Sequence, residues 1–317
     1  MMYADLHCDT LTVCEDLIAG TAQVSLPRLQ AAGCGLQCFA AFVRTDRTAQ
    51  PFDAVMRWAD ALWRAVEAAE GVAYPVRKAS DWDEARRRGL VGAMLTLEEG
   101  AVGAEAEHLR SLYSAGARMM SLTWNFDNAL GHPNLHETRV SALGRDVLYE
   151  IDLRPLTARG REVVRQMNDL GMMVDVSHLG DGGFWDVIAV SRLPVVASHS
   201  NARAVCGVSR NLSDDMIRAL ADNGGVMGLN WCPDFLSPDG TDVGRYALMH
   251  VRHVWEVGGE DVLALGTDFD GTATKAPLFA CEDVPVWYEA LASVIPPRVV
   301  DKMMWRNFYR VMAAVCG

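Results

Sequence analysis

Histidine and carboxylate side chains end several short apolar segments of this sequence. His7 and Asp9 end the first segment and Glu98 ends the third. His178 and His199 end the fifth and the sixth. Imidazole nitrogens and carboxylate oxygens are common ligands of Zn²⁺. Each residue alone is more often an ordinary polar strand end or a buried histidine bonded to a carbonyl. Together they would be costly to bury without a partner, so the sequence predicts a metal centre.

The number of such residues favours two cations. Two divalent ions about 3.5–4 Å apart can share a hydroxide and stabilise a tetrahedral transition state. A carboxylate that binds both ions would hold them at that spacing. The pKa of the shared water would then fall toward about 7, which gives a nucleophile at neutral pH. Asp268 ends the eighth apolar segment and would join the same group, although it could instead cap the following turn.

The elements that must position these residues follow from the apolar pattern. Helical periodicity and short apolar runs alternate along the chain. Strands are expected at residues 3–9, 36–43, 91–98, 119–124, 172–178, 194–200, 225–231 and 262–268. Helices are expected at 53–69, 104–115, 158–169, 182–190, 213–222, 242–257 and 297–314, with a weaker one near 25–32. Thr157 and Ser213 stand where helix N-caps belong.

Eight strands that alternate with helices predict an α/β fold, a (β/α)8 TIM-type barrel of the metal-dependent hydrolase kind. A doubly wound open sheet is the main alternative, but no G-x-G-x-x-G follows the first strand. In a barrel the active site lies at the carboxyl ends of the strands, so the polar strand ends would converge. We expect residues 1–317 to form one domain. The long segment at about 125–157 would lie over the active-site face, as a lid or as a contact in a homodimer.

The composition limits the possible binding partners of the protein and its cellular compartment. The net charge of −12 argues against nucleic acid as a partner. The eight cysteines contain no C-x-x-C pair, which favours reduced thiols in a cytoplasmic protein. No apolar run is long enough to span a membrane, and the N-terminal residues do not form a secretory signal. We therefore expect a cytoplasmic protein that acts on a small molecule.

With these residues located, the sequence resembles the renal (membrane) dipeptidase family, which is peptidase family M19 of the amidohydrolase superfamily. The matching segments occur in the family's order and cover nearly the whole chain. Animal members carry a signal peptide and a lipid anchor, so we expect a soluble, bacterial-type member. The segments are Asp5–Thr10, Leu95–Gly100, Val174–His178, Ser198–Ser200, Ser209–Asn211 and Gly266–Gly271.

The resemblance implies a role for each metal-type residue. His7 and Asp9 would hold one zinc ion, and His178 and His199 would hold the other. Glu98 would bridge the two ions, although the adjacent Glu99 could take that place. Asp268 would carry the proton from the bridging hydroxide to the leaving amine.

Three further residues would contact the substrate. The resemblance implies that Arg210 binds the terminal carboxylate of a short peptide. Without the resemblance, Arg210 would be read as a surface arginine that pairs with Asp214 or Asp215. Animal relatives have a histidine where this chain has Trp124, and Asn125 could supply a hydrogen bond in its place.

The sequence thus predicts a zinc-dependent dipeptidase whose substrates are short peptides, some with a D-residue at the C-terminal side. An amidohydrolase acting on N-acyl or lactam substrates is the nearest alternative, and a non-catalytic metal-binding homologue is a third. Many related barrel enzymes use H-x-H on the first strand and a carbamylated lysine as the bridge. This chain has no H-x-H, and its three lysines, Lys78, Lys275 and Lys302, lie away from the candidate ligands.

Overall fold

A computed structural model of the chain describes residues 2–14, 16–136 and 150–317. Part of the predicted segment 125–157 therefore lies outside the described residues. One parallel sheet has the order β1-β2-β4-β5-β6-β7-β8-β9, with β3 beside β4. Its strands are β1 (Tyr3–Cys8), β2 (Cys34–Phe42), β3 (Ala73–Pro75), β4 (Val91–Glu98), β5 (Ala117–Ser121), β6 (Met173–Asp175), β7 (Val196–Ser200), β8 (Val226–Leu229) and β9 (Leu263–Leu265).

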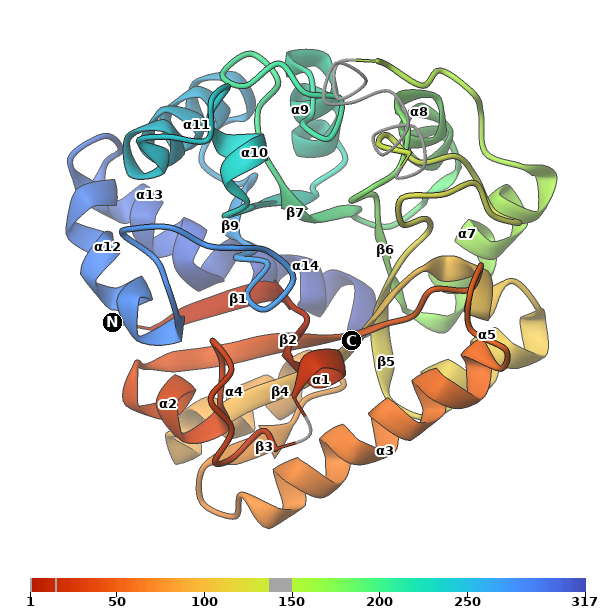
Figure 1. Cartoon of the computed structure of the whole chain (residues 1–317), viewed down its shortest axis with the longest axis horizontal. Coiled ribbons are helices and arrows are strands. Elements are labelled where there is room, and N and C mark those ends of the chain that lie inside the picture. Colours follow the sequence, from red (N-terminus) through yellow and green to blue (C-terminus); the bar gives the residue numbers. More distant parts are fainter. Residues whose placement is uncertain (1, 15, 137–149) are drawn as a thin grey trace.

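The sheet curves round until its first and last strands meet. Cys8 and Phe269 form a parallel bridge, in which the Asp9 N–H donates to the Phe269 carbonyl at 2.9 Å. The Asp268 N–H donates to the His7 carbonyl at 3.2 Å. The strands form the centre of the molecule and the helices surround them (Figure 1). The predicted TIM-type barrel is confirmed.

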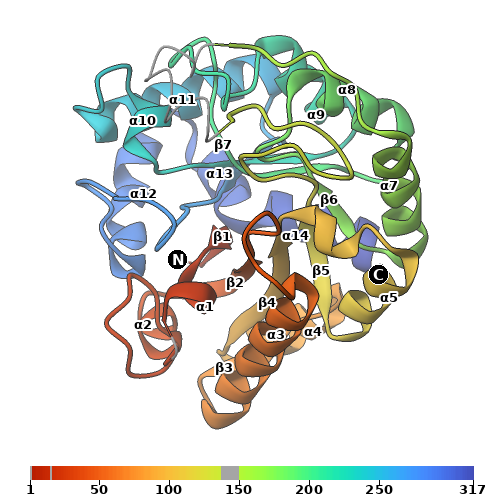
Figure 2. The same ribbon diagram turned by 45° about the vertical axis from the view of Figure 1, so that its right-hand side comes forward.

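Helices cover the outside of the barrel, as a second view shows (Figure 2). Thr157 and Ser213 cap their helices as predicted, by accepting the N–H groups of Gly160 and Met216. The longer helices are α3 (Pro51–Ala68), α4 (Ala79–Arg88), α5 (Ala106–Ser114), α7 (Ala158–Leu170), α8 (Asp181–Val190), α9 (Asp214–Asp222), α11 (Val243–Gly258), α12 (Val284–Ala292) and α14 (Asn307–Cys316). The short ones are α1 (Thr10–Val13), α2 (Leu26–Ala31), α10 (Pro233–Leu236) and α13 (Pro297–Asp301).

A compact apolar cluster joins the strands to the C-terminal helix. Phe308 and Met312 of α14 belong to it, and both are buried. Each of the eight strands on the main path contributes at least one buried residue, among them Ala4, Leu36, Met94, Met119, Met173, Val196, Val226 and Ala264. Other residues of the same strands, such as Leu95 and Ala197, belong to a second and larger apolar cluster. The strands are thus apolar on both faces, and their polar ends remain for the site.

The predicted elements agree with the structure, but several observed elements were not predicted. All eight predicted strands and the helices between them are present, including α2 near residues 25–32. The sequence did not reveal β3, which has three residues, or α4, whose sequence ASDWDEARRR is mostly charged. Also unpredicted are α1, α10 and α12. Among the described residues, no helix has the length and apolar character needed to cross a membrane.

Candidate metal and substrate site

The predicted metal-type residues meet in one place. His7, Glu98 and His199 present ligand atoms within 4.8 Å of one another, and so do His7, Asp9 and Asp268. All five of these side chains are buried. The two groups share His7, so they form one continuous cluster. A cavity of about 340 Å³ opens beside the cluster and is lined by Asp9, Glu98 and Asp268, among others.

Glu98 lies between the histidines and turns one oxygen to each side. Its Oε2 lies 3.6 Å from Nε2 of His7. Its Oε1 lies 3.0 Å from Nε2 of His178 and 3.6 Å from Nε2 of His199. A carboxylate in this position can bind one cation with each oxygen, which is the geometry that a bridging ligand needs.

The neighbouring Glu99 is directed elsewhere. Its backbone adopts φ 87°, a left-handed conformation that is uncommon for a side chain other than glycine. Its carboxylate accepts hydrogen bonds from Asn128 Nδ2 at 2.7 Å and from the N–H groups of Ala101 and Trp124, both at 3.1 Å. Burial raises the pKa of Glu99 to about 7. Protein donors thus occupy Glu99, and Glu98 is the carboxylate that faces the histidines.

Hydrogen bonds fix the protonation of the His199 ring. The Ser198 hydroxyl has one proton, which it donates to Oδ2 of Asp175 at 2.5 Å. Its oxygen lies 2.7 Å from Nδ1 of His199, so it must accept a proton from that nitrogen. Asp175 is held in turn by the Ser121 hydroxyl at 2.6 Å. His199 therefore carries its proton on Nδ1 and points an unprotonated Nε2 at the cluster.

The His178 ring also carries its proton on Nδ1 and leaves Nε2 unprotonated. Its Nδ1 lies 2.8 Å from Oδ1 of Asn125, an acceptor that requires a proton on Nδ1. Burial lowers the pKa of His178 and of His199 well below the usual range, and the charge of Arg210 contributes to both shifts. Yet Nε2 of His178 lies only 2.9 Å from Nε2 of His199. Two unprotonated imidazole nitrogens this close repel each other unless a cation lies beside both, so these residues fit a metal ion.

The carboxylates also require a cation. Burial raises the pKa of Glu98 well above its usual range, and the charge of Asp9 adds to the effect. Burial likewise raises the pKa of Asp268 to about 6. Burial alone would lower the pKa of His7, but Glu98, Asp9 and Asp268 together raise it to about 10. His7 Nε2 and Asp9 Oδ1 are buried without a hydrogen-bond partner among the described residues, as ligands of an ion would be.

The backbone at the site is shaped for this cluster. His178 and Asp268 have φ angles of 67° and 63°, in the left-handed region where non-glycine residues are strained. At Gly271, a Cβ would overlap Oδ2 of Asp9 and Oδ1 of Asp268. Glycine thus leaves room for two carboxylates to approach. Asn230 holds the Asp268 carboxylate in position, because Nδ2 of Asn230 donates to Oδ2 of Asp268 at 3.0 Å.

Arg210 lies inside the protein rather than on its surface. Its side chain is only 1% exposed, and its Nη1 donates to the Ser200 hydroxyl at 3.0 Å. Its Nε and Nη2 are buried and have no hydrogen-bond partner in the described part of the chain. The alternative pairing on the surface is wrong, because Asp214 contacts His253 and Asp215 contacts Arg218.

A braced loop carries Arg210 from the end of β7. Ala202 and Leu212 form a parallel bridge across its base. Arg203 donates to both carboxylate oxygens of Asp181 at 2.7 Å and also to the Ser209 carbonyl at 3.2 Å. The loop is therefore held against α8. An arginine with two unpartnered nitrogens in such a loop is suited to bind a carboxylate through paired hydrogen bonds.

Trp124 and Asn125 line the same cavity after β5. Both are half-buried. The Trp124 ring lies 4.9 Å from the Phe42 ring and 6.3 Å from the His178 ring, measured between centroids. The sequence therefore located both residues at the site, but it did not reveal that Asn125 supports His178.

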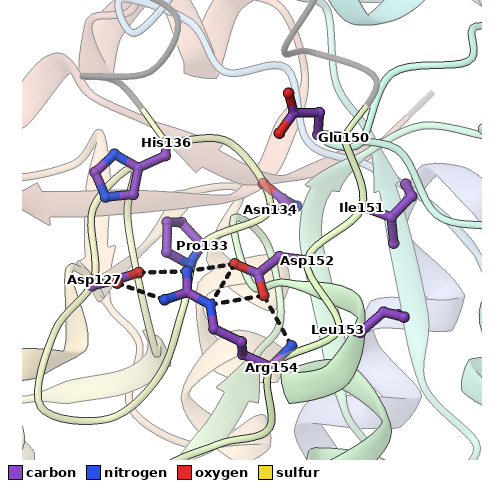
Figure 3. Close-up of a pocket in the computed structure, with 9 residues that line it drawn as sticks. All are labelled: Asp127, Pro133, Asn134, His136, Glu150, Ile151, Asp152, Leu153 and Arg154. Atoms are coloured by element: carbon purple, nitrogen blue, oxygen red, sulfur yellow. Dashed lines mark hydrogen bonds and ion pairs between the residues drawn. The ribbon is translucent and has the colours of Figure 1, made fainter.

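A second cavity, of about 470 Å³, contains none of the predicted site residues. Arg154 lies between Asp127 and Asp152 there and donates to both carboxylates (Figure 3). Asn134 lines this cavity, and its backbone N–H donates to the His178 carbonyl at 2.7 Å. The ion pairs thus fix residues 150–154 to the segment that supports a candidate ligand.

Residues that the sequence did not assign hold the ligands in place. Asp175 and Ser198 support His199, and Asn230 and Gly271 shape the surroundings of Asp268. Asp175 and Ser198 belong to the motifs that carry the family resemblance, and their position beside ligands was the available signal. Nothing in the local sequence indicates Asn230.

Known proteins are similar to this chain in sequence and in fold. The sequence matches the family described as membrane dipeptidase, peptidase family M19, over residues 1–316. An uncharacterized protein encoded in the 5′ region of pqqA in Klebsiella pneumoniae is 37% identical over 237 residues, which cover 72% of this chain and 84% of that protein.

Two solved structures are similar over almost their full length. A metallopeptidase from Rhodobacter sphaeroides, liganded with a phosphinate mimic of the dipeptide L-Ala-D-Ala, has a TM-score of 0.88 at 25% identity and covers 99% of both chains. The dipeptidase AC, a metallopeptidase of family M19, has a TM-score of 0.88 at 26% identity, covering 100% of this chain and 99% of its own.

The barrel and the cluster of metal-type residues define a metal-dependent hydrolase. The chain belongs to the membrane dipeptidase family, peptidase family M19. It is accordingly a metallopeptidase that hydrolyses the peptide bond of dipeptides.

Proposed function

We propose that this dipeptidase works with two Zn²⁺ ions. His7 and Asp9 would hold one ion, His178 and His199 the other, and Glu98 would bridge them. The supporting observation is the set of unprotonated or unpartnered ligand atoms on both sides of Glu98. Their nitrogen and oxygen chemistry suits zinc. When bound, the two ions lower the pKa of a shared water toward about 7 and so supply a hydroxide nucleophile.

The protein's own residues would then place the substrate and move the proton. Arg210 binds the terminal carboxylate of a dipeptide through its unpartnered Nε and Nη2. Asp268 accepts the proton of the nucleophile on Oδ1 and donates it to the leaving amine, while Asn230 holds its Oδ2. Asn125 holds the His178 ring in position, and the Asn125 side chain also lines the cavity.

The buried Arg210, with two unpartnered nitrogens, is the observation that favours a dipeptide as the substrate. A buried guanidinium near the cluster selects a free carboxylate, and it places the single peptide bond of a dipeptide close to the ligands. Longer peptides would present their carboxylate elsewhere. We also propose that a C-terminal D-residue is accepted, because the similar metallopeptidase from Rhodobacter sphaeroides is liganded with a mimic of L-Ala-D-Ala.

Rates on matched substrates test this proposal. Zinc-loaded protein should hydrolyse L,L and L,D dipeptides much faster than their C-terminal amides. Arg210→Met should cost about 2–4 kcal/mol in kcat/KM for dipeptides and remove the discrimination against amides. Arg210→Lys should rescue only in part, because an ammonium lacks the paired donors of a guanidinium.

A control and a metal measurement complete the test. Arg298→Met removes an exposed arginine that pairs with Glu260, and it should leave dipeptide kinetics unchanged. Elemental analysis of protein purified without chelator should give close to two equivalents of zinc or a similar ion. Unchanged amide discrimination in Arg210→Met would favour an amidohydrolase acting on N-acyl or lactam substrates. Metal content near zero without activation by added zinc would exclude the two-ion mechanism.

A further inference from the structure

The cavity has an aromatic wall on one side of the metal-type cluster. Phe42 ends β2 and is the register partner of Glu98 on β4. Trp124 follows β5, and its ring packs against the Phe42 ring at 4.9 Å between centroids, with an interplanar angle of 56°. Both rings line the cavity. The wall therefore stands directly beside the carboxylate that faces the histidines.

The Trp124 ring is held from several directions. The Arg44 guanidinium lies 5.0 Å from its centroid, and Arg44 also pairs with Asp46 at 2.8 Å. Phe126 contacts it edge to face at 6.0 Å between centroids. The backbone N–H of Trp124 donates to the Glu99 carboxylate at 3.1 Å. A ring fixed in this way presents a constant apolar surface, so a ligand side chain that covers it displaces water without first ordering the wall.

The order of the strands places this wall opposite Arg210. Around the closed ring, four steps separate β2 from β7 on either side. Arg210 is tied to Ser200 at the end of β7, and Phe42 ends β2. A dipeptide that is held at Arg210 by its carboxylate would thus extend its N-terminal residue across the cluster toward Phe42. Near Arg210 itself, the ring at 5.6 Å from the guanidinium belongs to Phe235.

The two sides of the cavity differ in chemistry where the N-terminal residue would lie. The side formed by β1 and β9 presents the carboxylates of Asp9 and Asp268, whose negative charges suit the α-ammonium group of the peptide. The side formed by β2 and β5 presents Phe42 and Trp124 and offers an apolar surface. The side chain of the N-terminal residue is thereby directed to the aromatic wall.

We infer that Phe42 and Trp124 form the subsite for the N-terminal side chain, so that the enzyme selects dipeptides with a large apolar N-terminal residue. This inference rests on the proposed role of Arg210 as the carboxylate anchor. Burial of a leucine or phenylalanine side chain against such a wall gives about a 10–100-fold gain in kcat/KM over glycine.

A substrate series with a constant C-terminal glycine tests the subsite without any question of C-terminal chirality. Zinc-loaded enzyme should hydrolyse Leu-Gly and Phe-Gly at least about tenfold more efficiently than Gly-Gly, with Ala-Gly between them. Trp124→Ala should reduce the ratio of Leu-Gly to Gly-Gly to within about threefold. Trp124→Phe should keep most of the ratio, because it retains an aromatic surface.

A matched aromatic variant shows which end of the peptide each ring contacts. Phe235→Ala should leave the ratio of Leu-Gly to Gly-Gly unchanged and should alter the ratio of Gly-Leu to Gly-Gly. A flat Xaa-Gly series in the wild-type enzyme would overturn the subsite, as would an unchanged ratio in Trp124→Ala. Hydrolysis of no dipeptide in either series would overturn the proposed function together with the subsite. The wild-type series decides the question even if a variant does not fold.

Discussion

The hydroxyl of Ser198 should set the metal affinity of the site. Ser198→Ala removes the only side-chain oxygen that accepts the Nδ1 proton of His199 among the described residues. The imidazole would then lose the partner that fixes its tautomer and orientation. Partners of this kind are typically worth 10–100-fold in metal affinity, which corresponds to about 1.4–2.7 kcal/mol. We expect the zinc affinity of Ser198→Ala to fall by that factor.

A matched serine separates this effect from general damage to the core. Ser121 is also buried, and its hydroxyl also donates to Asp175, at 2.6 Å. Its hydroxyl is not hydrogen-bonded to an imidazole in the described part of the chain. Both variants should lower the stability of the metal-free protein by about 1–3 kcal/mol, because each removes a donor from a buried carboxylate. Only Ser198→Ala should weaken zinc binding strongly.

Competition with a chromophoric chelator gives the zinc dissociation constants, and denaturant melts of metal-free protein give the stabilities. If Ser198→Ala and Ser121→Ala shift the zinc dissociation constant equally, the hydroxyl acts through the core and not through His199. If Ser198→Ala binds zinc as wild type does, the reasoning from the tautomer is refuted.

Three further changes have defined outcomes. Asp268→Asn should keep its metal and lose about 10²–10⁴-fold in kcat; loss of metal would instead make Asp268 a ligand. Gly271→Ala should lower zinc content below that of wild type, because its Cβ would overlap oxygens of Asp9 and Asp268; full zinc content would contradict this. Burial lowers the pKa of His250 from 6.5 to about 4, so the stability gained from neutral His250 is complete above pH 6.5 and is lost as the pH falls through 4. Urea melts of wild type and His250→Gln should therefore converge on acidification, and parallel pH profiles would show that another group is responsible.

The sequence predicted the barrel because its strands are apolar on both faces and polar at one end. This pattern is local, so the strands could be located without knowledge of their partners. The same reasoning missed α4, because its charged sequence shows few apolar positions and only Trp82 and small residues are buried. It also missed β3, which is too short to show a period.

The sequence indicated the residues of the candidate site, but it did not indicate how they contact one another. Glu98 and Glu99 are adjacent, and only the left-handed backbone of Glu99 shows which of them turns away from the cluster. Arg210 stands close to Asp214 and Asp215 in sequence, so local charge suggested a surface pair. Its burial depends on the packing of the loop after β7, which no local pattern reveals.

The closure of the barrel has a consequence for when the site can exist. The hydrogen bonds that join the two ends of the sheet run between Asp9 and Phe269 and between Asp268 and His7. The residues that close the ring are thus the candidate ligands or their neighbours. The proposed proton carrier, Asp268, therefore lies beside His7 only once the last strand has closed the ring. The ions would join the first strand to β4, β6 and β7, and the hydrogen bonds of the closure join it to the last strand.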